Sequence, residues 1–314
     1  MKAIVLRRNS NAETPLVELK EVGIPIVPPG SVLVKVIASA IQPSDLINAR
    51  GGFPYTTFPR IPGRDFAGYI ATGPRCGEQI YGSSGYTHGF TCDGFHAEYR
   101  VIPESSIVTK PTNISFKQAA CMGVPFSTAR ILLSRANVRD VETVLVIGAF
   151  GSVGSAVTQL ARAQGCSVIT AGRSKNADID TTMDTNLSGL DSITQGRGVN
   201  VVIDTTGVPA LIEAAINKLA HGGRIAIIAA LGDVKLSIDI KDFYRQEKSL
   251  IGCNSLSYSM SEIAEQIRSL GADFEIKKLM PPSQGLWTEI GLEQAVEIYK
   301  SGSASTGKFV VVFD

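Results

Sequence analysis

The sequence has few cysteines, almost no net charge and no long apolar run. Its five cysteines among 314 residues are scattered and odd in number, which predicts reduced thiols in a cytoplasmic protein. The formal net charge of +1 gives no reason to expect binding to nucleic acid or to a membrane surface. No apolar run approaches the roughly 20 residues that span a bilayer, and the first charged residues come too early for a signal peptide. A chain of this length is expected to form two domains.

The most informative segment is 144–161, which reads as a buried strand, a glycine-rich turn and an amphipathic helix. Glycines allow a tight turn and let the backbone approach phosphates, and the free N–H groups at a helix start attract anions. We therefore expect a dinucleotide pyrophosphate to bind here; the alternative is a tight turn that binds nothing. The residues expected to surround it are Gly148, Gly151, Ser152, Val153 and Gly154.

The next strand, at 167–172, indicates which dinucleotide binds. NAD sites usually carry an acidic residue at the end of this strand, bonded to the ribose 2′-hydroxyl. Here Gly172 stands at that place, followed by Arg173 and Ser174. A small residue with a guanidinium and a hydroxyl suits a 2′-phosphate, so we predict NADPH rather than NADH. The alternative is that Arg173 and Lys175 are solvated surface cations.

The pattern of strands and helices divides the chain into three parts. Residues 1–120 are rich in strands, and 121–259 alternate strands with helices, which is typical of a parallel sheet. The segment 176–190 has little helical period and predicts a shortened crossover. The tail, 260–314, contains a helix near 292–300 and an apolar strand at 309–313, which we expect to complete the sheet of the first domain.

Six motifs together resemble one family, the medium-chain dehydrogenases/reductases, in their zinc-independent, quinone oxidoreductase-like branch. The motifs are Ile41–Asp45, Pro62–Gly68, Phe126–Thr128, the Gly148–Gly154 turn, Asp204–Gly207 and Gly307–Lys308. The resemblance covers nearly the whole chain. It implies an α/β protein with a GroES-like, β-rich catalytic domain (1–120 and 260–314) and a doubly wound Rossmann domain that binds NADPH (121–259). Further cofactor residues that it implies are Thr128, Thr206, Gly207, Ala230, Leu231 and Asn254.

The resemblance also indicates whether the protein can bind a catalytic zinc ion. Zinc-dependent members hold a catalytic metal through three side chains, and the matching positions here are Gln42, Arg64 and Val124. An amide, a guanidinium and an isopropyl group cannot form a zinc site, so no catalytic metal is expected. Cys76, His88, Cys92 and His96 are zinc-ligand types within 21 residues, but nearby glycines make a helix improbable and no Cys-x-x-Cys pair exists. A loop with free thiols is the preferred interpretation.

Reaction chemistry then favours particular substrates. Hydride transfer to a carbonyl compound builds negative charge on oxygen, and a saturated ketone needs strong polarisation by a metal or acid. A quinone or an α,β-unsaturated carbonyl delocalises this charge, so hydrogen-bond donors suffice. The candidate catalytic residues are Gln42, Ser44, Tyr55 and Arg64. Ser44 is equally well explained as a turn-capping residue, and an ion pair between Arg64 and Asp65 is preferred to substrate contact.

The position that often carries a catalytic tyrosine in enoyl reductases of this family holds Phe53, and Tyr55 lies two residues further on. Two alternatives therefore stay open: a tailoring enoyl or keto reductase of a biosynthetic pathway, and a non-catalytic NADPH-binding sensor or interaction protein. The apolar strand near 249–253 indicates an unpaired sheet edge. Members of the family that the chain resembles commonly pair their Rossmann domains along this edge, so the resemblance implies a homodimer formed through the Rossmann domain.

Overall fold

The computed structural model describes residues 1–8, 16–230, 232–283, 285–301 and 307–313. Its contacts divide the chain into two compact units, each described here by itself. Unit 1 comprises residues 1–127 with 255–314, and unit 2 comprises residues 128–254. The sequence had placed these boundaries at 120/121 and 259/260. No helix in the described ranges is long and apolar enough to cross a membrane.

Unit 2 is built on a six-stranded parallel sheet. Its strands lie in the order β12-β11-β10-β7-β8-β9. Their bounds are β7 (Thr143–Ile147), β8 (Ser167–Gly172), β9 (Ile179–Asp180), β10 (Val199–Asp204), β11 (Leu219–Ile227) and β12 (Ser249–Gly252). Numbered from β7, this is the order 3-2-1-4-5-6 of doubly wound dinucleotide-binding sheets. The central strands are mostly apolar and buried because both faces of the sheet are covered.

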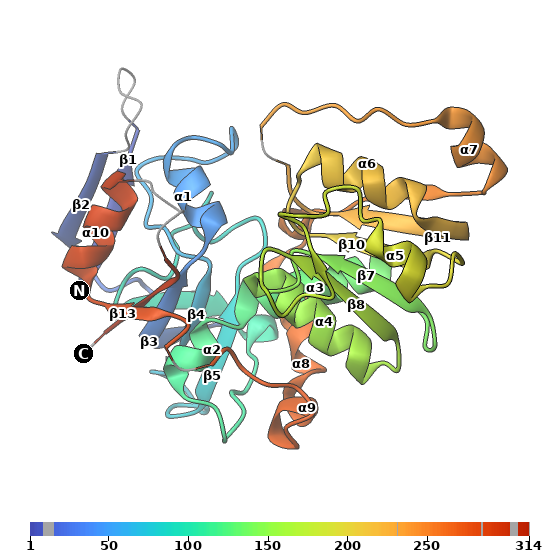
Figure 1. Cartoon of the computed structure of the whole chain (residues 1–314). Coiled ribbons are helices and arrows are strands. Elements are labelled where there is room, and N and C mark those ends of the chain that lie inside the picture. The colour runs from blue at the N-terminus through green and yellow to red at the C-terminus, as the bar shows by residue number, and fades with distance from the viewer. Residues whose placement is uncertain (9–15, 231, 284, 302–306, 314) are drawn as a thin grey trace. The chain divides into compact units, whose positions relative to one another are not determined.

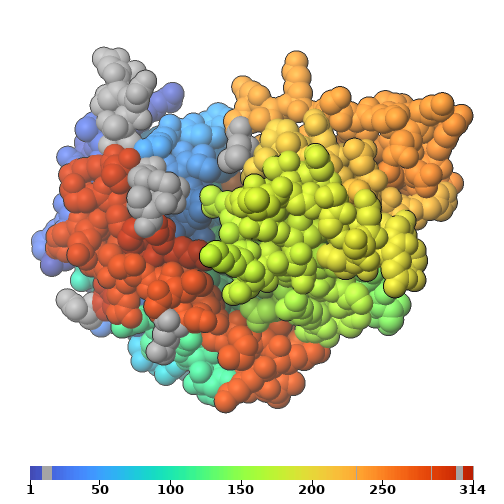
Figure 2. All heavy atoms as spheres, viewed as in Figure 1, coloured from blue at the N-terminus to red at the C-terminus, as the bar shows by residue number. Residues whose placement is uncertain are grey.

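Helices cover this sheet from both sides, as the ribbon of unit 2 shows (Figure 1). Helix α4 contacts β7, β8 and β10, and α6 contacts β11. The bounds are α3 (Gly123–Arg135, which begins in unit 1), α4 (Ser152–Ala163), α5 (Gly189–Ile193), α6 (Pro209–Asn217) and α7 (Ile240–Arg245). No helix joins β8 to β9, so the expected shortened crossover is confirmed. Figure 2 shows α7 at the surface of this unit, with Ile240 and Tyr244 each more than 60% exposed.

Unit 1 contains a mixed sheet in the order β13-β14-β3-β4-β5, with β6 also paired to β3, and a separate hairpin of β1 and β2. The strands are β1 (Lys2–Arg7), β2 (Leu16–Glu21), β3 (Ser31–Ile41), β4 (Asp65–Ile70), β5 (Gln79–Ser83), β6 (Tyr99–Pro103), β13 (Thr288–Ile290) and β14 (Phe309–Val312). Strand β14 pairs antiparallel with β3, so the C-terminal strand completes this sheet, as predicted.

Short helices surround the sheets of unit 1. They are α1 (Pro43–Ala49), η1 (Glu104–Ser106), α2 (Phe116–Ala120), η2 (Ser255–Ser257), α8 (Met260–Arg268), α9 (Gly271–Glu275) and α10 (Leu292–Ser301). Helix α10 packs beside the β1–β2 hairpin, whereas α2 contacts β3, β4, β5 and β14 (Figure 1). The apolar core between these elements includes Ile4, Phe66 and Tyr299, all fully buried.

Candidate cofactor turn and active site

The glycine turn after β7 has no space for a side chain at positions 148 and 154. Gly148 has a φ of +80°, and its N–H donates to the Ala171 carbonyl at 2.9 Å. A Cβ on Gly154 would lie only 2.1 Å from the Gly148 carbonyl oxygen. The Gly151 N–H donates to that same oxygen at 2.9 Å, which fixes the turn. Glycine is therefore required at 148 and 154 by local geometry.

Helix α4 starts directly from this turn. Gly151 is its N-cap in an extended conformation, and no side chain caps the helix start. The first N–H groups, those of Ser152, Val153 and Gly154, have no acceptor within the helix. Together with the helix dipole they form an anion-binding end of the kind that holds pyrophosphate. The cofactor residues expected here are thus brought together on one turn.

The end of β8 presents a cation instead of a carboxylate. Gly172 is buried beside the Phe150 ring, and Arg173 is exposed with no hydrogen bond or ion pair to any described residue. The Ser174 hydroxyl accepts from the Asn176 N–H at 3.2 Å. The nearest acid along the chain, Asp178, accepts from the Thr170 N–H and hydroxyl at 2.7 Å. The carboxylate is therefore already bonded back to β8.

The loop after β10 borders the glycine turn. The carboxylate of buried Asp204 accepts from the hydroxyl of Thr206 at 2.7 Å and from the N–H of Gly207 at 2.9 Å. Burial raises the pKa of this carboxyl group, and these hydrogen bonds act in the opposite direction. Thr205 donates to the Ile147 carbonyl at 2.9 Å, which ties the loop to β7. Gly207, with φ +68°, lies against the backbone at 229–230.

The remaining expected cofactor residues are more scattered. Thr128 on α3 is buried, and its hydroxyl has no hydrogen-bond partner in the described part of the chain. Ala230 and Asn254 are exposed at the ends of the segments that follow β11 and β12. Leu231 lies outside the described residues. The structure thus groups the glycine turn, the β8 end, the β10 loop and Ala230 by direct contacts.

In unit 1, a buried polar cluster forms where β3 ends and α1 begins. The Gln42 side chain donates to Asp65 Oδ2 at 2.8 Å, and Asp65 also accepts from the Val124 N–H at 2.9 Å. Asp45 accepts from the Gln42 N–H at 2.8 Å and closes the first turn of α1. Asp45 therefore has a structural role in this turn. Gln42 and Asp45 rather than Ser44 therefore stabilise this turn.

Arg64 lies in the same cluster and is almost fully buried. Its NH1 donates to the Ser44 hydroxyl at 3.2 Å and its NH2 to the Ser84 carbonyl at 3.2 Å. Its Nε has no partner among the described residues. The expected ion pair with Asp65 is not formed, because the Asp65 carboxylate bonds Gln42 and the Val124 N–H instead.

Burial controls the ionisation of this cluster. It raises the pKa of Asp45 to about 7, and the nearby Arg64 charge opposes this shift. Burial also raises the pKa of Asp65 to about 6, against the hydrogen bonds that Asp65 accepts. Desolvation lowers the pKa of Arg64, while both aspartates favour its charged form. The cluster therefore keeps one guanidinium beside two carboxyl groups that titrate close to neutrality.

Aromatic rings lie against this cluster. The guanidinium of Arg64 is 5.8 Å from the centre of the Phe90 ring, which packs edge-on to Phe53 at 5.4 Å and beside Tyr55 at 5.5 Å. Tyr55 is 41% exposed, and partial burial raises its pKa, so it is a protonated donor at neutral pH. Sequence reasoning missed Phe90 and Ser84, because nothing local marks residues that approach Arg64 through the fold.

His88 and His96, the two histidines of the segment from 76 to 96, both form hydrogen bonds within unit 1. His88 Nε2 pairs with the Val101 carbonyl at 3.2 Å, and His96 contacts the Ala40 carbonyl and the Tyr299 hydroxyl at 3.3 and 3.0 Å. Burial lowers the pKa of each imidazole to about 4. The segment is not helical, as predicted. No three His, Cys, Asp or Glu side chains gather as a metal site within the described residues.

A doubly wound parallel sheet with a glycine turn at its first crossover helix defines a dinucleotide-binding dehydrogenase domain. The comparisons agree with this class. Residues 28–112 match the alcohol dehydrogenase GroES-like domain, and residues 152–270 match the zinc-binding dehydrogenase family. The chain belongs to the medium-chain dehydrogenase/reductase superfamily, in its quinone oxidoreductase-like branch, and is an oxidoreductase.

Similar proteins cover nearly the whole chain. A zinc-type alcohol dehydrogenase-like protein of Schizosaccharomyces pombe is 45% identical over 88% of this chain and 86% of its own length. A quinone oxidoreductase of Homo sapiens is 29% identical over 93% and 92%. The solved structure of a Pseudomonas syringae quinone oxidoreductase superposes with a TM-score of 0.81 at 20% identity, covering all of both chains, which confirms the fold.

Proposed function

We propose that this protein is a zinc-independent oxidoreductase that transfers hydride from NADPH to a quinone or an α,β-unsaturated carbonyl compound. The observation that carries the proposal is the buried Gln42–Arg64–Asp65 cluster, which has donors and a cation where zinc-dependent relatives have metal ligands. The names of the quinone oxidoreductase of Homo sapiens and of a tomato 2-methylene-furan-3-one reductase, 33% identical over 45% of this chain, support the two substrate classes.

Zinc does not fit this cluster. The Gln42 side-chain amide donates its N–H to Asp65, so its donor side faces that carboxylate. The buried guanidinium of Arg64 would repel a divalent cation at close range. Val124 supplies no donor atom through its side chain, and its N–H is already bonded to Asp65. We therefore derive no step through a metal.

Arg64 instead takes the role of polarising group. Its Nε is a charged donor without an acceptor among the described residues, while its other nitrogens are held by Ser44 and Ser84. A donor fixed in this way is suited to the oxygen on which charge develops when a quinone or enone is reduced. Ser44 acts as the residue that positions the guanidinium, and Gln42 orients Asp65 from the other side.

Tyr55 is our candidate for proton delivery. It lies on the exposed side of the aromatic cluster, and its raised pKa keeps the phenol protonated at neutral pH. The partly exposed ring of Phe53 beside it offers an apolar face. Such a face suits planar conjugated substrates, which stack on aromatic rings.

The residues of unit 2 fit NADPH. When bound, the reduced nicotinamide supplies the hydride. The backbone N–H groups at Ser152–Gly154 hold the pyrophosphate, and the unpaired guanidinium of Arg173 with the Ser174 hydroxyl holds the 2′-phosphate. The Asp178 carboxylate bonds Thr170, so it is not free to repel that phosphate.

The test is consumption of NADPH, compared with NADH, over a panel of quinones, enones and saturated aldehydes, each with and without a chelator. We expect turnover of quinones or enones, a preference for NADPH and no effect of the chelator. Turnover of saturated carbonyls alone, abolished by the chelator, would contradict the proposal. NADPH binding without turnover on any acceptor would favour the non-catalytic alternative.

We also propose a homodimer formed through unit 2. Strand β12 stands at one end of the sheet and pairs only with β11 within the described residues, and Leu250 on it is 44% exposed. A second copy that pairs along this edge would satisfy its backbone groups. Light scattering on the purified protein tests this, and a monomeric mass would contradict it.

A further inference from the structure

Near the end of α1, Asn48 carries a side-chain amide that is almost completely buried. Its Nδ2 donates to the Gly89 carbonyl at 2.7 Å, and its Oδ1 accepts from the Thr56 hydroxyl at 2.5 Å. A carbonyl oxygen can only accept, so the nitrogen end of the amide must face Gly89 and the oxygen end must face Thr56. Asn48 therefore joins two loops, residues 50–57 (loop 50–57) and residues 87–92 (loop 87–92), through the two ends of one amide.

Both loops carry aromatic rings of the candidate active site. Tyr55 lies in loop 50–57, and its ring centre is 5.5 Å from that of Phe90 in loop 87–92. The Arg64 guanidinium is 5.8 Å from the centre of the same Phe90 ring. A displacement of either loop would therefore change where the Tyr55 phenol lies relative to Arg64.

The amide acts on the residue next to Tyr55. Thr56 directly follows Tyr55 in the chain, so a bond to its hydroxyl restrains the backbone that carries the phenol. A second link, from the Thr57 N–H to the Phe90 carbonyl at 3.1 Å, joins the same two loops through their backbones. Replacing both partners of a buried hydrogen bond by apolar groups can leave stability almost unchanged. A buried amide at position 48 is therefore explained by the geometry that it fixes rather than by the stability that it adds.

We propose that Asn48 is a positioning residue of the candidate active site, which holds the Tyr55 phenol in place by bonding the Thr56 hydroxyl and the Gly89 carbonyl. The inference rests on the proposed function, because it takes Tyr55 as the group that delivers the proton. In that step the phenol O–H bond breaks and the proton joins the anion of the reduced substrate, an enolate or a hydroquinone anion. The phenolate then takes a proton from water. Proton transfer depends steeply on position, so a fixed loop raises kcat without contributing to the binding of NADPH.

The first test does not need turnover. Tyrosine labelled with ¹³C at Cζ gives an NMR signal that reports ionisation of the phenol, and Tyr55→Phe identifies the signal of Tyr55 among the eight tyrosines. Partial burial raises the pKa of Tyr55, more than the nearby Arg64 charge lowers it. Removal of the amide in Asn48→Leu, or of the hydroxyl alone in Thr56→Val, should admit water to the ring and lower this pKa. Thr56→Ser keeps the hydroxyl and should retain the pKa of the unmodified protein.

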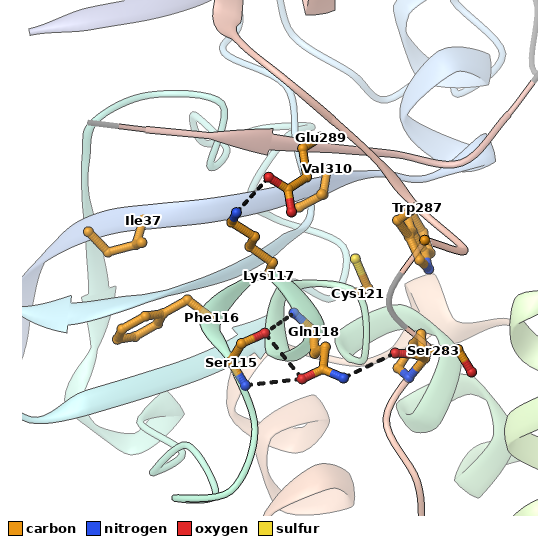
Figure 3. Close-up of a pocket in the computed structure, with 12 residues that line it drawn as sticks. Ile37, Ser115, Phe116, Lys117, Gln118, Cys121, Ser283, Trp287, Glu289 and Val310 are labelled. Atoms are coloured by element: carbon orange, nitrogen blue, oxygen red, sulfur yellow. Dashed lines mark hydrogen bonds and ion pairs between the residues drawn. The ribbon is translucent and has the colours of Figure 1, made fainter.

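Gln118→Leu is the matched control for Asn48→Leu. The Gln118 amide likewise joins two segments of unit 1, because it donates from α2 to the Pro282 carbonyl at 3.4 Å. Figure 3 shows Gln118 on the wall of a cavity that Trp287 also lines. This amide bonds neither of the two loops around Tyr55, so its removal should leave the titration of Tyr55 unchanged.

The second test measures turnover of 4-phenyl-3-buten-2-one and of 1,4-naphthoquinone with NADPH. Tyr55→Phe should lower kcat about 100-fold, the loss of one general acid. Thr56→Val should lower kcat about tenfold and leave the KM for NADPH unchanged, and Thr56→Ser should recover the rate. Added to Tyr55→Phe, Thr56→Val should cause no further loss, because the proton that it positions is already absent. Thr109→Val, which removes an exposed hydroxyl bonded to Glu78, should leave kcat unchanged.

An unchanged titration of Tyr55 in both Asn48→Leu and Thr56→Val would overturn the positioning role. An equal loss of kcat from Thr56→Val with and without the phenol would also overturn it, because a purely structural role acts in both backgrounds. If Asn48→Leu does not fold, Thr56→Val at its half-buried position still carries both tests. If the unmodified protein turns over neither acceptor, the proposed function fails, and the titration decides by itself whether Asn48 positions the phenol. Full turnover in Tyr55→Phe would contradict proton delivery by Tyr55 and with it the catalytic part of the inference.

Discussion

The replacement Gly154→Ala adds a single methyl group to the glycine turn and so tests whether this turn binds the cofactor. The new Cβ would lie 2.1 Å from the Gly148 carbonyl oxygen and 2.9 Å from the Ala149 Cα, so the turn must move by about 1 Å to accept it. Such overpacking lowers the free energy of unfolding by about 1–3 kcal/mol. The better helix propensity of alanine raises it by up to about 1 kcal/mol. We therefore expect the free energy of unfolding to fall by about 1–2 kcal/mol.

The effect on NADPH should be larger than the effect on stability. Moving the turn displaces the N–H groups that face the pyrophosphate, and one charge-assisted hydrogen bond contributes about 1.5–3 kcal/mol. We expect the Kd for NADPH to rise by about 10- to 100-fold, measured by the change in cofactor fluorescence on binding. Gly151→Ala should show a smaller effect, because its Cβ would stand 3.2 Å from the same oxygen.

Gly271→Ala is the matched control for this series. It adds the same methyl group at the first residue of α9, where no atom lies within 4 Å of the new Cβ. Its Kd for NADPH should equal that of the unmodified protein, and its unfolding free energy should not fall and should rise by at most about 1 kcal/mol. If Gly154→Ala binds NADPH as tightly as this control does, the turn is not the pyrophosphate site.

Three further changes test the account. Arg64→Met should lower kcat by about 100-fold, the usual cost of removing one oxyanion donor, whereas Arg75→Met, at an exposed ion pair, should leave kcat unchanged in the same steady-state assay. Arg173→Ala should raise the KM for NADPH about tenfold and leave that for NADH unchanged, because only the 2′-phosphate is lost as a partner. Asp45→Asn should flatten the dependence of stability on pH. The folded-state pKa of Asp45, about 7, lies above its unfolded value, so the protonated form stabilises the fold at low pH and this stability is lost as pH rises from about 4 to about 7.

For each of these three variants, one result would contradict the prediction. An unchanged kcat in Arg64→Met would show that the guanidinium is structural. An equal rise of KM for both cofactors in Arg173→Ala would place this side chain elsewhere than at the 2′-phosphate. Denaturant unfolding at several pH values should show a loss of a few kcal/mol between pH 4 and pH 7 for the unmodified protein, and the same loss in Asp45→Asn would assign it to other groups.

The sequence predicted those features that depend on local geometry. The run from Val144 to Gly154 combines an apolar strand with glycines whose spacing only a tight turn explains, and the structure has β7, the turn and α4 there. The apolar tail at 309–313 was correctly expected to complete the first sheet, because so apolar a strand needs a partner.

Features that depend on distant contacts were not predictable. The partners of Arg64 are Ser44 and Ser84, each 20 residues away. The expected ion pair with its neighbour Asp65 is absent because that carboxylate bonds Gln42 and Val124. His96 contacts Ala40 and Tyr299, the second of which is 203 residues away. The cavity at Trp287 likewise combines α2 with the C-terminal segment, and no local motif marks it.

The most direct test of the central claim is the rate of NADPH oxidation by one quinone and one enone in the presence of a chelator, for the unmodified protein and for Arg64→Met. The account predicts chelator-resistant turnover in the first and about 100-fold slower turnover in the second. Activity that disappears with the chelator, or that is equal in both proteins, would contradict it.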